Sequence, residues 1–403
     1  MIRVAMISPL PPEKTGEAPY AAQLIRSLAE TGKVSIIAIA GESAAPIHSP
    51  TSEIETLPIW NGQSLMYPLR LMRQIVKRRC HISHVQFGPH GRVYGGRFGE
   101  VMLLLLILLR IAGVKTTMTL HSTWMPWQVV DRVRKYRFLG RLSVLAAPLF
   151  RLYMKFLNWG TDTVQLSTTR ENSLLRRAFL KEYGFGPEKV LEIPHPCATL
   201  EERTDQQLAA KALGMDGKRV ILLFGFIRDG KGFETALSSM ARVKEKFPDV
   251  ALLVAGRPQD AMGARYLKKL HRIVRELGIE EVVRFDTHFI PDDEVSKYFS
   301  ASTLLLVPYT DSVGASGPIH NYASYGVPIV ASDAGLHNRE SLGGNILLFK
   351  SGNADSLADT LIGILSKPSA MAAISQKQIQ YAKRENWSLA AARTIRNYHK
   401  TLR

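Results

Sequence analysis

Short apolar runs alternate with longer stretches of mixed polarity along almost the whole chain. The runs of the first half are IRVAMIS, VSIIAIA, ISHVQF and TTMTLHS, and those of the second half are RVILLFGF, VALLVAG, VVRFDT, LLLVPY and PIVASD. Helical spacing predicts helices between them, over residues 19–30, 65–79, 234–245 and 265–277. Strands buried on both faces of a parallel sheet read as short β-branched runs connected by helices. The pattern therefore predicts an α/β fold with two doubly wound, Rossmann-like domains.

This alternation is interrupted near the middle of the chain. Residues 192–207, EIPHPCATLEERTDQQ, contain two prolines and a polar stretch in which neither the strand nor the helix pattern continues. We expect one domain over residues 1–195 and a second over 196–385, because each is long enough to bury its own core. Two such domains facing each other would create a deep cleft lined by the carboxyl ends of their strands.

The chain is strongly basic, and the excess is concentrated in the first half. The formal net charge is +17, and residues 1–195 hold 25 Lys and Arg against 13 Asp and Glu. A one-sided basic field favours an anionic partner, and we expect no nucleic acid because no recognition module for it is present. Residues 131–156 interleave Arg and Lys with Phe, Leu and Tyr. They are typical of a helix on an anionic membrane surface, although a solvated basic face fits them about as well.

The N-terminus and the cysteines indicate where the protein resides and what it binds. Residues 1–8 read as a buried strand and lack the layout of a signal peptide, so we expect a cytoplasmic protein, peripheral on the inner face of the membrane if the basic segment binds there. Residues 101–109, VMLLLLILL, are too short to span a bilayer, which takes about 20 residues. Cys80 and Cys197 are too few for a disulfide framework or a zinc site, and we expect no metal and no cofactor.

A first candidate phosphate loop lies in LLFGFIRDGKGFETAL, where a strand leads through glycines into a helix. Gly225 to Lys231 fits the spacing of a nucleotide-triphosphate loop, but Gly232 stands where a Ser or Thr hydroxyl should hold magnesium. This argues against a triphosphatase. Arg228 and Lys231 are close enough in sequence to reach one phosphate group, although alone they also fit a helix start with two exposed cations.

A second candidate loop, ASGPIHNYASYG, begins at residue 315. Ser316 and Gly317 precede a helix start at Pro318, where backbone amides and the helix dipole favour an anion. It contains no Asp, Glu, Lys or Arg, and His320 is its one basic side chain. Both loops follow predicted strands of the second half, one offering cations and the other amides. Together they suit a diphosphate.

With these motifs the chain resembles the GT-B glycosyltransferases, in particular the retaining family-4 group that uses nucleotide-diphosphate sugars. The resemblance rests on the opening segment ISPLPPEKTGEAPYAAQLIRSLAETGKVSIIA, on TLHSTW, on FGFIRDGKGFETALSSM, and on ASGPIHNYASYGVPIVASDAG. The last nineteen residues, ENWSLAAARTIRNYHKTLR, are similar to the terminal helix of that group, which implies that residues 386–403 cross back to the first domain.

The resemblance implies a role for each matching residue. Lys231 and Arg228 would contact the donor diphosphate and act in catalysis. His121 would lie near the transferred sugar as a third catalytic residue, although a lone histidine at a strand end fits a structural role equally well. The remaining residues implied by the resemblance are Gly16, Gly225, Ser316 and Gly317 for the diphosphate, Asn321 for the nucleotide ribose, and Thr15 with His121 for the acceptor. The partners would be a nucleotide sugar and an acceptor sugar or lipid-linked acceptor.

The family that the chain resembles usually has two glutamates eight residues apart in this region. Val313 and Asn321 stand at those positions here. The loss of the first concerns the sugar of the donor, whereas Asn321 can still hydrogen-bond a ribose hydroxyl. The expected reaction is sugar transfer with retention, in which the leaving diphosphate is stabilised electrostatically. The alternative is a catalytically weak scaffold of the same fold that binds a nucleotide or an anionic partner.

Overall fold

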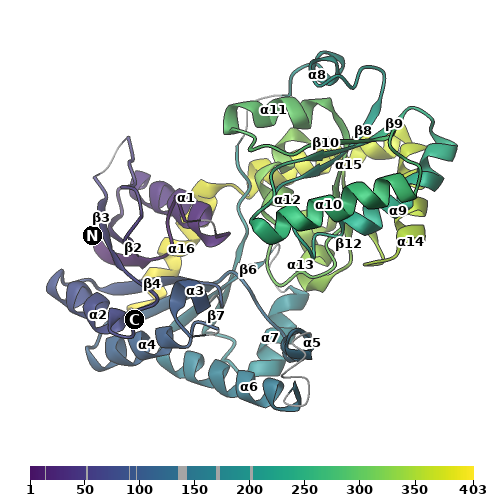
Figure 1. Cartoon of the computed structure of the whole chain (residues 1–403). Coiled ribbons are helices and arrows are strands. Elements are labelled where there is room, and N and C mark those ends of the chain that lie inside the picture. Colours follow the sequence, from purple (N-terminus) through teal and green to yellow (C-terminus); the bar gives the residue numbers. More distant parts are fainter. Residues whose placement is uncertain are drawn as a thin grey trace. The chain divides into compact units, whose positions relative to one another are not determined.

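The computed structural model describes residues 1–13, 15–50, 53–89, 91–96, 98–134, 143–168, 173–199 and 203–403. It divides into two compact units, one formed by Met1–His195 with Trp387–Arg403 and the other by Pro196–Asn386. Each unit is built on one parallel sheet flanked by helices (Figure 1). The chain therefore has the α/β class that the alternating pattern predicts.

The sheet of the first unit has the strand order β3-β2-β1-β4-β5-β6-β7. All neighbouring strands pair in parallel. The strands are β1 (Ile2–Ile7), β2 (Val34–Gly41), β3 (Glu55–Trp60), β4 (Ile82–Phe87), β5 (Lys115–Leu120), β6 (Thr163–Thr168) and β7 (Val190–Pro194). The chain starts in the middle of this sheet and builds outward first to one side and then to the other. The direction reverses between β1 and β4, which is the topological switch point of a doubly wound sheet.

Eight helices of the first unit lie in its described residues. They are α1 (Glu17–Glu30), α2 (Tyr67–Lys77), α3 (Gly91–Tyr94), α4 (Val101–Ile111), α5 (Pro126–Arg134), α6 (Ser143–Gly160), α7 (Leu174–Tyr183) and α16 (Trp387–Thr401). The C-terminal helix α16, yellow in Figure 1, packs beside α1, where Ala391, Ile395 and Tyr398 share a core with Leu24 and Leu28. The last helix of the chain thus completes the unit that the first strand begins.

The apolar run at residues 101–109 forms most of α4. Leu105, Leu106 and Leu109 are buried within the first unit. In the part of the chain that the structure describes, no single helix is long and apolar enough to cross a membrane, and one bent pair, Ala354–Leu365 with Pro368–Arg384, passes by length and composition only.

The sheet of the second unit has the order β10-β9-β8-β11-β12-β13 and is also parallel throughout. Its strands are β8 (Arg219–Phe224), β9 (Val250–Ala255), β10 (Val283–Asp286), β11 (Ser302–Val307), β12 (Ile329–Ser332) and β13 (Leu347–Phe349). The helices are α8 (Gln206–Ala212), α9 (Phe233–Lys246), α10 (Ala261–Glu276), α11 (Asp292–Ala301), α12 (Gly317–Asn321), α13 (Gly335–Glu340), α14 (Ala354–Leu365) and α15 (Pro368–Arg384), with 3-10 turns η2 (Ala323–Tyr325) and η3 (Ser341–Gly344).

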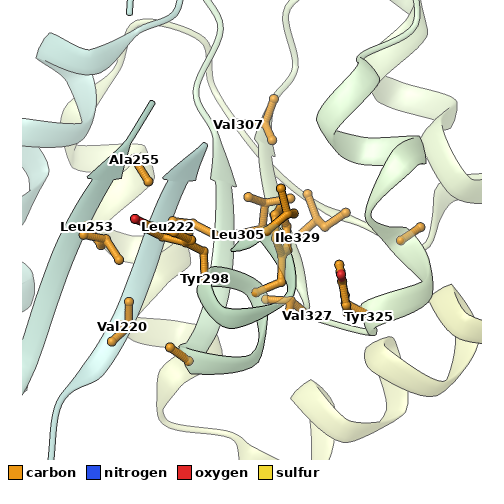
Figure 2. Close-up of a cluster of buried hydrophobic side chains, with 14 of the residues drawn as sticks. Val220, Leu222, Leu253, Ala255, Tyr298, Leu305, Val307, Tyr325, Val327 and Ile329 are labelled. Carbon is orange, nitrogen blue, oxygen red and sulfur yellow. The ribbon is translucent and has the colours of Figure 1, made fainter. Parts of the chain in front are cut away.

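The middle strand β8 explains why its run is apolar without alternation. Val220 and Leu222 pack into the core on one face of the sheet, shown in Figure 2, whereas Ile221 and Leu223 pack into the core on the other face. Successive side chains of a strand point to opposite faces, so a strand covered on both sides can be apolar at consecutive positions. Only its carboxyl end remains for chemistry.

Candidate functional site

Two loops meet at the carboxyl edge of the second sheet, where the strand order reverses. One loop follows β8 and the other follows the neighbouring strand β11, and the Thr310 backbone N–H donates to the Gly230 carbonyl at 3.1 Å. Gly232 has φ +74°, and a Cβ placed on it would lie 1.7 Å from the Pro308 carbonyl oxygen. Only glycine permits this approach of one backbone to the other. Ligands of doubly wound folds bind at this edge, beside the switch point.

The two cations of the first loop gather around Tyr309 of the second. Lys231 Nζ lies 3.6 Å from the centroid of the half-buried Tyr309 ring. Burial by itself would raise the pKa of Tyr309, but the charge of Lys231 and its hydrogen bond outweigh it, and Ser316 and the charge of Arg228 act in the same direction. The pKa of Tyr309 is therefore lowered. Arg228 is exposed, and in the part of the chain that the structure describes its guanidinium donates to the Asp229 carbonyl at 3.1 Å, so further donors remain available to a ligand.

The loop before α12 adds a buried hydroxyl and open space to this positive region. Ser316 is 5% exposed, and its buried hydroxyl lies close enough to Tyr309 to help lower the pKa of that residue. A Cβ added to Gly317 would meet only the Asn321 side-chain nitrogen, at 3.8 Å. Pro318 lies in the first turn of α12, as the sequence predicts. The loop thus has room for a ligand and places a buried hydroxyl next to Tyr309, the ring over which Lys231 lies.

We predict that Gly317→Val weakens nucleotide binding without destabilising the fold. The protein itself leaves space for the side chain, so a diphosphate in the loop would be the group it displaces. Isothermal titration with nucleoside diphosphates should show a loss of at least about tenfold, or about 1.4 kcal/mol, at an unchanged melting temperature. If the variant binds nucleotide as well as the parent protein, the loop is only a packed turn.

The one histidine of the second loop has a structural role. His320 Nδ1 donates to the Ser316 carbonyl at 3.0 Å, and burial lowers the pKa of His320 to about 4. The ring is therefore neutral near pH 7. His337 is buried as well, and its pKa is also lowered to about 4, mainly by burial and less by the nearness of His320, beside which a second positive charge is unfavourable. Both histidines are therefore buried neutral side chains that supply no charge to the loop.

Three further side chains follow strands at this edge, and sequence reasoning did not single them out. Arg257 lies between two exposed aromatic rings, with its Cζ 5.8 Å from the centroid of Phe226 and 5.0 Å from that of Phe289. Arg257 follows β9, Phe226 follows β8 and Phe289 follows β10. The only sequence signal is that each follows a strand end, and only the strand order reveals that they stack. Gly225 lies at the base of this group, with φ +121° and its N–H donating to Ala255.

In the first unit, Thr15 and Gly16 stand in the loop after β1, also at a switch point. Thr15 Oγ1 accepts from the Ala18 N–H at 3.2 Å, which caps the start of α1. A Cβ added to Gly16 would meet nothing within 4 Å. The Thr15 hydroxyl thus contributes to helix α1, whereas the space at Gly16 is open to a ligand.

His121 follows β5 and is held from two sides. Its Nε2–H donates to Gln86 Oε1 at 2.8 Å, and its backbone N–H donates to the Phe87 carbonyl at 2.9 Å. The ring contacts the edge of Tyr20, with centroids 4.6 Å apart. A half-buried imidazole fixed by an amide oxygen is an oriented group, as a site residue requires.

Behind His121 a hydrogen-bond chain runs through the buried sheet. Gln86 Nε2 donates to His84 Nε2 at 3.0 Å, and His84 Nδ1 lies 2.6 Å from the hydroxyl of Tyr398 on α16. Burial, with a smaller contribution from His121, lowers the pKa of His84 to about 3. His84 is therefore a neutral link that orients Gln86. Sequence reasoning missed both residues, although polar side chains two apart in a buried strand are an unusual pattern.

A small cavity lies beside the segment that follows His121. It has about 280 Å³ of empty space, including open solvent, and aromatic and aliphatic side chains form most of its wall. Phe87 and Leu120 line it from the sheet, and Phe150 lines it from α6. The Thr123 hydroxyl and the Trp124 indole nitrogen are buried there and lack a hydrogen-bond partner within the described residues. The enclosed part of this space is about the size of one water molecule, so the feature is a narrow hollow with a mostly apolar wall.

Two further sequence-based expectations concern metal binding and the basic segment 131–156. The described residues contain no group of three or more His, Cys, Asp or Glu that could hold a metal ion. Cys80 and Cys197 are buried free cysteines. Of the basic segment 131–156, residues 135–142 lie outside the described residues.

Comparison with known proteins identifies relatives of both the second unit and the whole fold. Residues 205–385 match the model of the family described as Glycosyl transferases group 1. The chain is 27% identical over 225 residues to D-inositol 3-phosphate glycosyltransferase of Kribbella flavida, which covers 54% of this chain and 52% of that protein. The chain thus spans about half the length of the curated relatives it matches.

Solved structures resemble the chain over its full length. HepE of Anabaena in complex with UDP and glucose has a TM-score of 0.69 at 15% identity, and covers 99% of this chain and 100% of that one. Sucrose-phosphate synthase of Thermosynechococcus elongatus has a TM-score of 0.70 at 19% identity, with 99% of both chains covered. At such identities these likenesses establish the fold.

Proposed function

Since residues 205–385 belong to the glycosyl transferases group 1 family and the chain has the GT-B fold, we propose that the protein is a glycosyltransferase. It moves a sugar from a nucleotide-diphosphate sugar to an acceptor hydroxyl with retention of the anomeric configuration. The donor occupies the carboxyl edge of the second sheet. HepE, of the same fold, binds UDP and glucose, which supports a nucleoside diphosphate as the anion.

The observation that carries this proposal is that Lys231, the buried Ser316 hydroxyl and the charge of Arg228 all act on Tyr309. Breaking the anomeric C–O bond places negative charge on the leaving diphosphate. Cations and a hydroxyl fixed by the fold stabilise that charge without having to reorganise. Charge-assisted hydrogen bonds are the strong ones, so these donors bind a diphosphate better than neutral groups would.

The neighbouring side chains would hold the nucleoside. Arg257, Phe226 and Phe289 present a stacked, partly exposed surface on the same edge, which suits the flat face of a base. Asn321 at the end of α12 is half-buried and would hydrogen-bond a ribose hydroxyl. With the base against Arg257 and the diphosphate at Lys231 and Gly317, the transferred sugar would lie on the far side of the diphosphate from the base.

We predict that Asn321→Leu weakens nucleotide binding by about 1–2 kcal/mol, because a ribose hydroxyl loses its hydrogen-bond partner. Asn321→Glu should be tolerated or bind more tightly, since a carboxylate accepts from two hydroxyls at once. Calorimetric titration of both variants with the same nucleoside diphosphate checks this. Equal affinities of the parent and the leucine variant would remove Asn321 from the site.

The first unit would bind the acceptor. Thr15 and Gly16 offer an open loop, and His121 is an oriented imidazole next to a cavity with an apolar wall. The acceptor would be a sugar or a lipid-linked sugar. The acceptor hydroxyl would attack from the side of the leaving diphosphate, which takes up its proton, so no carboxylate nucleophile of the enzyme is needed.

We extend the proposal to peripheral association with an anionic membrane, supported by the basic excess of residues 1–195.

One observation favours a second function. Val313 and Asn321 stand where two glutamates are usual, so a scaffold that binds nucleotide but transfers sugar slowly is the competing proposal. Turnover and thermal-shift assays with UDP-, GDP-, ADP- and dTDP-sugars separate the two. Release of nucleoside diphosphate that depends on an acceptor supports the transferase, whereas stabilisation without turnover supports the scaffold.

A further inference from the structure

Helix α6 of the first unit is apolar on two opposite sides. Its inner side chains Phe150, Met154 and Leu157 are buried in the unit. Its outer side is the α6 stripe, in which every member is between 49% and 62% exposed: Leu145, Leu149, Leu152, Phe156 and Trp159. A surface helix of a water-soluble protein normally carries polar residues on its outer side. Something other than water is therefore expected to cover this side.

The stripe is straight and continuous. Its members recur at intervals of four, three, four and three residues, which aligns them along one side of an α-helix over about 21 Å. Trp127 of α5, a helix that packs against α6, is 54% exposed as well. Figure 1 shows α6 along one side of the first unit, with α5 and α7 beside it. Exposed apolar patches of this kind mark interaction surfaces.

The charges that border the stripe are positive. Helix α6 contains Arg151 and Lys155 and neither Asp nor Glu. Arg110 of α4 lies over the ring of Trp159, 5.0 Å from its centroid, and donates to the Trp159 carbonyl at 3.0 Å. Arg151 pairs with Glu182 at 2.6 Å, but Lys155 and Arg110 form no ion pair within the described residues. An apolar stripe with a tryptophan and cations at its border is typical of a helix at an anionic lipid surface.

We propose that the outer side of α6 docks on an anionic bilayer, with the stripe inserted at the boundary between headgroups and acyl chains. Lys155 and Arg110 lie at the level of the headgroups. A second copy of this chain is a poorer occupant, because it would bring the same cations together in a protein of net charge +17. The inference rests on the proposed membrane association and names its surface. Because Phe150 on the inner side of α6 lines the cavity after His121, docking brings the bilayer next to the region proposed for the acceptor.

Vesicle co-sedimentation of the full chain tests this. The vesicles are phosphatidylcholine alone and phosphatidylcholine mixed with phosphatidylglycerol. The stripe variant is Leu149→Gln with Phe156→Gln, and a control variant removes two apolar side chains of the second unit that are more exposed, Leu208→Gln with Met262→Gln. We expect the parent and the control to prefer anionic vesicles and the stripe variant to lose about tenfold or more in partitioning. Lys155→Glu should lower the preference for anionic vesicles, and added salt should weaken it.

Each other outcome overturns part of the inference. If the stripe variant binds anionic vesicles as well as the parent, α6 is not the docking surface, although membrane association stands. If the parent binds neither kind of vesicle, both ideas are wrong. A dimer in analytical ultracentrifugation that the stripe variant dissociates, without vesicle binding, shows that a second copy covers the helix. Turnover with a soluble acceptor sugar, which both variants should retain, reports separately on the proposed sugar transfer.

Discussion

Replacing Lys231 by alanine is expected to lower kcat by roughly 10- to 150-fold, which corresponds to a loss of about 1.5–3 kcal/mol for a hydrogen bond to a charged group. The reason is that Lys231 lies over Tyr309, beside Ser316 and Arg228, where a leaving diphosphate would gain its charge. KM for the donor should change less than kcat, because the interaction strengthens as the bond breaks. Steady-state kinetics with the nucleotide sugar identified by the screen measure both constants.

The control for this variant is Lys297→Ala. Lys297 also lies over a tyrosine of the second unit, 5.7 Å from the centroid of Tyr298, and pairs with Glu294 on its own helix. Its removal should leave kcat unchanged. Arg228→Ala should resemble Lys231→Ala in direction. If Lys231→Ala and Arg228→Ala both keep the turnover of the parent, the donor site lies elsewhere.

The second large effect is expected from Gly232→Ala, on stability and activity together. An L-residue in the left-handed conformation costs about 1–2 kcal/mol, and here the added Cβ would also lie 1.7 Å from the Pro308 carbonyl oxygen. The backbone of one loop must therefore move away from the other. We expect the free energy of unfolding of the second unit to fall by more than about 2 kcal/mol, and turnover to fall with it because Lys231 precedes Gly232.

Gly217→Ala is the matched control for that prediction. Gly217 has φ +67° in the same unit, but a Cβ there would meet nothing within 4 Å. The free energy of unfolding of the Gly217→Ala variant should fall only by the conformational cost of about 1–2 kcal/mol. Differential scanning calorimetry of the full chain compares the two variants. Equal shifts of the melting temperature would show that the contact with Pro308 costs nothing, and the two loops would then not be locked together.

The same contact explains the residue that breaks the resemblance to a nucleotide-triphosphate loop. In the sequence, Gly232 stands in place of a magnesium-binding Ser or Thr. In the structure it adopts the left-handed conformation directly before α9, against the backbone after β11. The spacing of Gly225 and Lys231 can be read from neighbouring residues of the sequence. The role of Gly232 cannot, because it depends on Pro308, which lies 76 positions further along the chain.

Some strands could not be predicted from their residues. The apolar runs found β1, β2, β4, β5 and the strands β8 to β12, but β6 was missed because TVQLST reads as polar. Its Thr163 and Gln165 are buried nevertheless. Thr163 is satisfied by Thr401 at 2.9 Å on the C-terminal helix. Burial of a polar strand depends on partners that are distant in sequence, and no local pattern announces them.

The candidate site was predictable in the same uneven way. Arg228, Lys231, Ser316 and Gly317 were proposed from loops that follow strands and precede helices, and the structure brings them to one edge of the second sheet. Tyr309 was not singled out, because a tyrosine after a strand has no special pattern. Its place beneath Lys231 follows from β8 and β11 being neighbours.

The sequence by itself determined the fold class and which segments bear chemistry, because a strand buried on both faces, a helix start and a glycine loop are each specified by residues that are near neighbours in the chain. Only the tertiary structure decided which loops share an edge and which side chains orient His121. Gln86, His84 and Tyr398 form one hydrogen-bond chain although Tyr398 lies 314 residues beyond His84. The physical reason is that strand order and the docking of α16 are set by the summed packing of the whole unit, and no short segment contains that sum.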